Sequence, residues 1–174
     1  METKYNAKGQ ILSTELVLTF GIFMSALLIF LYVWGVVSYD YAQSQADREM
    51  QVVVLGISDA LVLTSGDPVD WEVSTPETFY SLGLAAAPNI LSTAKLSALQ
   101  SLNASYSTLH VSMGAGSFDT FVSAKLTNGT TLCQFGIPGD ELAQNVSSVT
   151  ETRMVALDDG SLARLSVQVW RIKG

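Results

Sequence analysis

The sequence contains very little cysteine, histidine and charge. Its one cysteine, Cys133, cannot form an internal disulfide, and His110 is the only histidine, so a zinc site of about four ligands lacks sulfur and imidazole donors. Nine Lys and Arg residues stand against 16 Asp and Glu, and the resulting net charge of −7 repels a phosphate backbone. We therefore expect neither a disulfide-stapled nor a zinc domain, and no nucleic-acid partner.

The shortage of charge is concentrated near the N-terminus. Charged residues make up 14% of the 174 residues, about half the usual quarter, and Glu15 is the only acid or base between Gly9 and Tyr39. The apolar run 11–37 would measure roughly 40 Å as a helix, which exceeds a hydrocarbon core of about 30 Å. This run predicts a transmembrane helix. It is too long for the hydrophobic region of an ordinary secretory signal peptide.

The charges on either side of the run predict its orientation. Lys4 and Lys8 precede it, whereas Asp40 and Asp47 follow it. Because basic residues stay on the cytoplasmic side, we expect a cytoplasmic N-terminus and an external C-terminal part.

A short motif stands at the start of the run. Lys8-Gly9-Gln10 is followed by apolar residues, with Ser13 and Glu15 close behind. This combination resembles the class III signal peptide of archaeal type IV pilin-like proteins. The resemblance implies that a membrane prepilin-type peptidase removes a cytoplasmic leader, residues 1–9, and that the mature helix packs with other pilin subunits in a filament core.

The resemblance also implies a role for Glu15. An unpaired carboxylate inside an apolar helix costs about 2.5–3.5 kcal/mol in a membrane, and pairing with the new α-amino group of a neighbouring subunit would remove that cost. A shallower Glu15 that reaches interfacial water is the alternative. In the family the Ser and Glu usually lie two and four residues after the Gln, whereas here they lie three and five after Gln10. Glu15 is the sixth mature residue after a cut at Gly9 and the fifth after a cut at Gln10.

Small residues interrupt the apolar run. Gly21 and Ser25 are four residues apart, and Ala26 and Gly35 follow. Small residues let membrane helices approach closely, although they are common in any membrane helix. We expect Gly21 and Ser25 to contribute to helix assembly.

The helical pattern continues beyond the membrane segment. We expect one hydrophobic N-terminal helix over residues 10–65, with its second half acting as a stem, ended by Gly66 and by Pro68 soon after. The alternative is an anchor followed by an unrelated stalk, since the run Val52–Val54 favours a strand.

Residues 66–174 predict a separate external head. An irregular segment contains Trp71, whose side chain we expect to pack against the core. Ser92 can cap a short helix. A further helical turn through Tyr106 and Leu109 is favoured over a strand.

The last third predicts two hairpins. Asn128-Gly129 is a type I′ turn signal between two strand-like segments, and Asp158-Asp159-Gly160 has the same chemistry. The fold class expected is α+β, with a long N-terminal transmembrane and stem helix packed on a four-stranded antiparallel sheet, as in type IV pilins.

Residues able to perform chemistry are scarce. Cys133 lies in a predicted strand, where a buried apolar thiol is commoner than a reactive one, and His110 has no nucleophile motif beside it. The pair Asp158-Asp159 could hold calcium but is first of all a turn. We expect no enzyme activity, no cofactor and no metal.

Three Asn-x-Ser/Thr sequons lie in the predicted external part, at Asn103, Asn128 and Asn145. Because glycan acceptors must lie outside the membrane, we expect glycan on at least one of them.

The sequence thus leaves two functional classes. The first is a major or minor structural subunit of an extracellular archaeal type IV pilus-like filament, with adhesion through the head. Its partners would be copies of itself or other pilin subunits, the membrane and a prepilin-type peptidase. The alternative is a single-pass, membrane-anchored surface binding protein that is not assembled into a filament.

Overall fold

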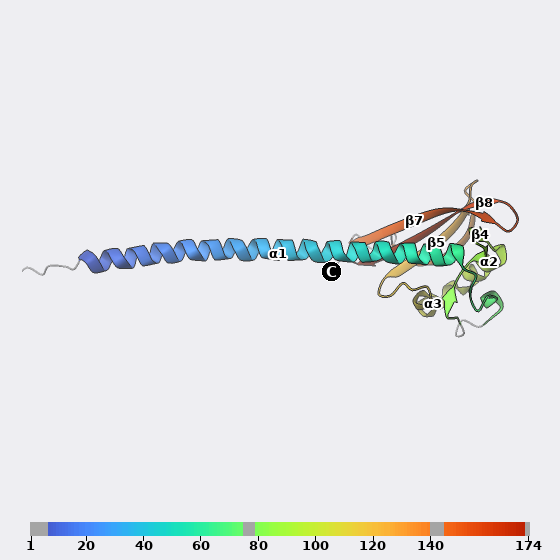
Figure 1. The fold of residues 1–174 in the computed structure, drawn as a ribbon, viewed down its shortest axis with the longest axis horizontal. Helices are drawn as coiled ribbons and strands as arrows, with labels where there is room; N and C mark the ends of the chain where they lie inside the picture. Colours follow the sequence, from blue (N-terminus) through green and yellow to red (C-terminus); the bar gives the residue numbers. More distant parts are fainter. Residues whose placement is uncertain (1–6, 75–78, 140–144, 173–174) are drawn as a thin grey trace, which may run out of the picture. The chain divides into compact units, whose positions relative to one another are not determined.

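The computed structural model describes residues 7–74, 79–139 and 145–172. The chain divides into two compact units, Met1–Gln45 and Ala46–Gly174. Helix α1 (Ala7–Leu63) supplies residues to both units (Figure 1). The predicted long helix is confirmed, and the strand alternative for residues 52–54 is wrong because those residues lie inside α1.

In the first unit, α1 carries an apolar surface. Every residue from 14 to 42 is exposed, including the aromatic residues Phe20 and Trp34. Within the described residues, Thr14–Leu63 is the only helix long and apolar enough to span a membrane. A helix satisfies its backbone hydrogen bonds internally, which is what a lipid environment requires.

The second unit is built on a mixed, six-stranded sheet in the order β3-β4-β7-β8-β5-β6. The strands are β3 (Ala85–Ala87), β4 (Ile90–Leu91), β5 (Asp119–Leu126), β6 (Thr131–Gly136), β7 (Val146–Leu157) and β8 (Leu162–Ile172). Both predicted hairpins, β5–β6 and β7–β8, are confirmed, and β8 pairs antiparallel with β5 between them.

The expected count of four antiparallel strands is wrong. Strand β4 pairs in parallel with β7, and β3 pairs antiparallel with β4. These two strands are too short to show an alternating pattern, and the turn between them uses Asn89 in the left-handed region, at φ 64°. A separate two-stranded pair joins β1 (Gly66–Asp67) to β2 (Ser81–Leu82).

One side of the stem part of α1 enters the core of this unit. Met50, Val54, Ile57 and Leu61 are buried, and their spacing of four, three and four residues places them on one helix face. They join the inward residues of the sheet in one cluster: Val122, Ala124, Cys133, Phe135, Leu165, Val167 and Val169. Buried residues alternate with partly buried or exposed ones along β5 and along β8 as far as Val167, which sets the sheet face that meets this core. Residues 167–170 of β8 are all buried.

The hairpin turns differ from the predicted type I′. The amide of Gly129 donates to the Leu126 carbonyl at 2.9 Å, and Gly129 has a φ of 91° whereas Asn128 has no positive φ. This is a type I turn followed by a glycine bulge. Gly160 does the same in β7–β8, donating to Leu157 at 2.9 Å with a φ of 85°.

Short helices flank the sheet: η1 (Trp71–Val73), α2 (Thr93–Ser101), η3 (Leu102–Ser105) and α3 (Tyr106–Ser112) (Figure 1). The predicted cap is confirmed, because the Ser92 hydroxyl accepts from the Lys95 amide at 3.4 Å. The favoured helical interpretation of residues 106–109 is confirmed by α3.

Candidate functional site

The residues of the predicted leader motif lie at the start of α1. Helix α1 begins at Ala7, so the backbones of Lys8, Gly9, Gln10 and Ser13 are helical. Residues 1–6 of the leader lie outside the described part of the chain. Cleavage after Gly9 or Gln10 stays a prediction.

Glu15 lies at the head of the exposed apolar surface. Its side chain is exposed and is followed directly by Leu16, which is 72% exposed, and Val17, which is 69% exposed. Glu15 makes no ion pair with any residue whose side chain the structure describes. A carboxylate at this position therefore has no counter-charge of its own in the described chain, and a lipid or helix-packed environment would require one.

The small residues Gly21 and Ser25 reduce the local width of helix α1. The Ser25 hydroxyl donates to the Gly21 carbonyl one turn earlier, at 2.8 Å, so the hydroxyl is satisfied within the helix. Apart from its chain neighbours and the backbone of its own helical turns, no described atom lies within 4 Å of the position that a Cβ on Gly21 would take. A second helix could approach the backbone closely at this point.

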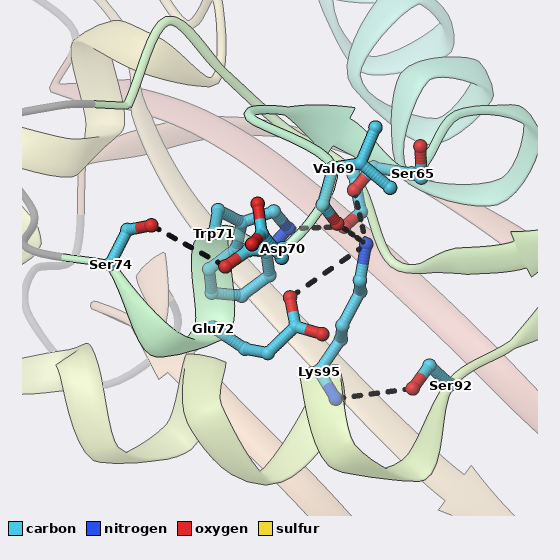
Figure 2. Close-up of polar contacts among 9 residues, drawn as sticks. Ser65, Val69, Asp70, Trp71, Glu72, Ser74, Ser92 and Lys95 are labelled. Atoms are coloured by element: carbon cyan, nitrogen blue, oxygen red, sulfur yellow. Dashed lines mark hydrogen bonds and ion pairs between the residues drawn. The ribbon is translucent and has the colours of Figure 1, made fainter.

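Lys95 forms a buried polar site that the sequence analysis did not identify (Figure 2). Its side chain comes from α2, is 5% exposed, and donates from Nζ to the carbonyls of Ser65 at 2.5 Å and Val69 at 2.6 Å. Glu72 Oε2 lies 3.9 Å from the same nitrogen. The ammonium group thus satisfies carbonyls just beyond the C-terminal end of α1, where a positive charge is favourable. A lysine in a helix that also carries Leu96 and Leu99 suggests a solvated side chain, so no sequence signal marks this burial.

Trp71 closes the segment that follows α1, as predicted. It is fully buried, and its Nε1 donates to the Gly83 carbonyl at 2.8 Å. Its ring packs edge-to-face against that of Phe79, with 5.6 Å between the ring centroids. Gly83 has no room for a side chain, because a Cβ would lie 2.3 Å from the Thr64 carbonyl oxygen. Trp71 and Lys95 therefore anchor the irregular segment from two sides.

The three sequon asparagines are exposed. Asn103 lies in η3 and accepts from the Gly136 amide at 2.8 Å, and Asn128 lies in the β5–β6 turn and accepts from the Thr130 amide at 2.9 Å. Asn145 lies directly before β7. In both described bonds the side-chain oxygen of the asparagine is the acceptor. The side-chain nitrogen, to which an N-linked glycan is attached, takes no part in these two bonds.

The acidic turn pair organises the backbone. Asp158 Oδ2 accepts from the Thr93 amide at 3.0 Å, at the first residue of α2. Asp159 accepts from the Ser161 hydroxyl at 2.6 Å and from the Ser161 amide at 2.8 Å, and these bonds hold its pKa below the usual range. Both carboxylates thus cap local structure, in agreement with the turn interpretation.

The side chains with reactive potential occupy structural positions. Cys133 is fully buried, and this burial raises its pKa to about 11. Tyr106 accepts from the Thr120 amide at 2.7 Å and donates to Asp119 at 3.1 Å, and burial raises its pKa. The His110 ring nitrogen lies 3.0 Å from the Ser107 carbonyl within α3.

Across the described residues, no three His, Cys, Asp or Glu side chains gather in a way that could hold a metal ion. The features that stand out are the exposed apolar helix with Glu15, the exposed sequons and the Lys95 site. Comparisons with protein-family models, with curated proteins and with solved structures found no match to this chain.

Proposed function

We propose that the chain is a structural subunit, major or minor, of an extracellular archaeal type IV pilus-like filament, and that its head serves surface adhesion. The observation that carries this proposal is the division of α1. Residues 14–42 expose an apolar surface, whereas Met50 to Leu61 of the same helix supply the core of an α+β unit.

An exposed apolar helix of this length has to be covered by lipid or by other helices. None of the most apolar stretch of this helix is buried within the described residues. Before assembly the membrane would supply the cover, with the N-terminus in the cytoplasm. In the filament, neighbouring copies or other pilin subunits would replace the lipid.

Glu15 and the leader support the filament role over simple anchoring. After a prepilin-type peptidase removes the leader, the new α-amino group of one subunit would neutralise Glu15 of another. In an anchor that stays in the bilayer, the same carboxylate would only reach interfacial water and would have no pairing role. Gly21 and Ser25 would let the paired helices approach closely.

Glu15→Leu tests this proposal, with Thr19→Leu as the matched control in the same helix. We expect Glu15→Leu to abolish filaments and to leave the protein in the membrane, whereas Thr19→Leu leaves filaments intact. Electron microscopy of the cell surface counts filaments, and surface labelling of the head measures display. Mass spectrometry of the native N-terminus reports cleavage after Gly9 or Gln10.

Two results would count against the filament. Filaments formed normally by the Glu15→Leu variant would contradict the proposed pairing of Glu15 with the α-amino group of another subunit. An intact Met1 on displayed protein, without filaments in the parent strain, would favour the single-pass surface binding protein.

The exposed sequons support a glycosylated head. We expect glycan on at least one of Asn103, Asn128 and Asn145 in protein purified from its host. Intact-mass analysis measures this directly, and a bare polypeptide mass would contradict it. Replacing the sequon hydroxyl, as in Ser105→Ala, removes a site without touching the Asn103 hydrogen bond to Gly136.

A further inference from the structure

Two cations stand side by side on the outer face of the sheet. Lys125 of β5 and Arg164 of β8 are directly opposite each other in the antiparallel ladder, and both are exposed. Their sequence neighbours Ala124 and Leu165 are buried in the core, so both cations lie on the face turned away from it. Like charges directly opposite each other destabilise a sheet.

No counter-charge for this pair is found in the described chain. Neither Lys125 nor Arg164 makes an ion pair with another described residue. The net charge of the protein is −7, yet these two bases lie opposite each other without an ion pair to a described acid. The repulsion would be relieved by an anion supplied from outside.

The two cations also line a pocket. It measures about 170 Å³, and Leu126, Thr127 and Gly129 complete its wall. The β5–β6 turn therefore forms one side of the pocket and the cations another. An arginine fork and a lysine ammonium together fit the oxygens of a carboxylate or sulfate group.

Uncharged hydrogen-bonding groups occupy the neighbouring rows of the same face. Ser123 of β5 lies opposite Ser166 of β8, which lies opposite Thr152 of β7, and the Ser166 and Thr152 hydroxyls are 3.2 Å apart. In the next row Phe121 lies opposite Gln168, whose side chain is buried and whose Oε1 accepts from the Gly139 amide at 3.2 Å.

Residues of these rows line a second pocket of about 170 Å³. It is lined by Phe121, Ser123, Thr150, Ser166 and Gln168. The serine and threonine hydroxyls can exchange hydrogen bonds with sugar hydroxyls, and an aromatic ring packs against the apolar face of a sugar. None of the residues lining either pocket is acidic.

We propose that this outer sheet face binds an acidic polysaccharide. Lys125 and Arg164 hold the acid groups of the chain, carboxylate or sulfate, and the hydroxyl rows bind the sugar hydroxyls between them. The proposal does not depend on filament assembly, because every residue in it belongs to the second unit.

Binding of immobilised polygalacturonate by the full chain tests this proposal. The protein is held in a polyoxyethylene detergent, which has no sugar head group, and carries Thr130→Ala to remove the sequon beside the pocket. We expect binding that weakens with salt. Dextran sulfate should bind through the same residues, whereas neutral dextran should not bind.

Lys125→Gln combined with Arg164→Gln should weaken binding about tenfold or more, since charge-assisted hydrogen bonds are lost. Arg48→Gln, which removes an exposed cation of α1, is the matched control and should leave binding unchanged. Near-UV circular dichroism confirms that each variant keeps its fold. Three results would overturn the proposal: no binding of polygalacturonate by the parent, unchanged binding by the double variant, or equally tight binding of polyglutamate.

Discussion

At the scale of single residues, Lys95 supplies a buried polar contact in the head. Its ammonium group is buried and donates to two backbone carbonyls, with Glu72 nearby. A carbonyl that is shielded from water and loses its donor costs about 1–3 kcal/mol, and the two bonds of Lys95 are partly buried. Lys95 therefore determines whether the segment after α1 stays closed.

Lys95→Met should lower the free energy of unfolding of the head by about 1–3 kcal/mol, because the carbonyls of Ser65 and Val69 lose their donor. Chemical denaturation followed by near-UV circular dichroism measures the change. Lys125→Met removes the same charge from an exposed position and should change stability by less than about 0.5 kcal/mol. Equal effects of the two variants would show that the buried contacts of Lys95 contribute nothing.

Cys133 provides a second prediction at this scale. Burial raises its pKa from 9.0 to about 11, so the folded protein at pH 8 holds about a hundredfold less thiolate than the unfolded chain. Iodoacetamide should therefore react with the native protein much more slowly than with the urea-unfolded protein, because the native thiol is both buried and less ionised, as measured by mass spectrometry. Similar rates in the two states would contradict the burial.

The sign of the corresponding pH effect follows from the same shift. Because folding disfavours the thiolate, the contribution of Cys133 to stability is complete below about pH 9 and is lost between pH 9 and pH 11. The free energy of unfolding of the Cys133→Ala variant should therefore fall less between pH 9 and pH 11 than that of the parent.

At the scale of elements, the glycines of the hairpin turns and of α1 should respond in opposite directions. Gly129 has a φ of 91° and open space around it, so Gly129→Ala adds only backbone strain and should destabilise the head by about 1–2 kcal/mol. Gly56 also has open space but is helical, so Gly56→Ala should stabilise by about 0.5–1 kcal/mol. Thermal unfolding of both variants measures the pair, and the same sign for both would refute the turn assignment.

The elements also show what the sequence could predict. The apolar run, the stem helix and both hairpins have patterns that extend over eight residues or more, and all appear in the structure. Strands β3 and β4 contain three and two residues, too few for alternation to be visible, and their place in the sheet depends on pairing with β7. The turn type was wrong because Asn-Gly fits both a type I′ turn and a type I turn with a glycine bulge.

The candidate sites were less predictable than the fold. Glu15 was visible because it is a lone charge in an apolar run. The burial of Lys95 depends on carbonyls 26 and 30 residues away, and the pairing of Lys125 with Arg164 depends on the register of two strands from different hairpins. Neither arrangement leaves a local pattern in the sequence.

At the scale of the whole molecule, the two units predict separable behaviour. The core of the second unit includes Met50, and the Ser147 hydroxyl donates to Asp47 at 3.0 Å, so both of these stem residues lie within the second unit, residues 46–174. A chain that starts at Ala46 should fold without detergent, as measured by circular dichroism and gel filtration.

A chain that starts at Ser58 is the control for this prediction. It lacks Met50, Val54 and Ile57, and losing three buried side chains at about 2–5 kcal/mol each is comparable to the whole stability of an ordinary domain. It should be unfolded or aggregated. Cooperative unfolding of the shorter chain would show that the stem part of α1 is dispensable.

The hydrogen bond between Asn103 and Gly136 affects how the heads behave when many of them lie close together. Strands β3 and β6 form the two edges of the sheet, and open edges recruit strands from other molecules. Asn103 satisfies the Gly136 amide at the end of β6, and β3 has only three residues to offer. Heads held at high local concentration would therefore remain separate folding units, because the sheet offers little backbone for strand exchange.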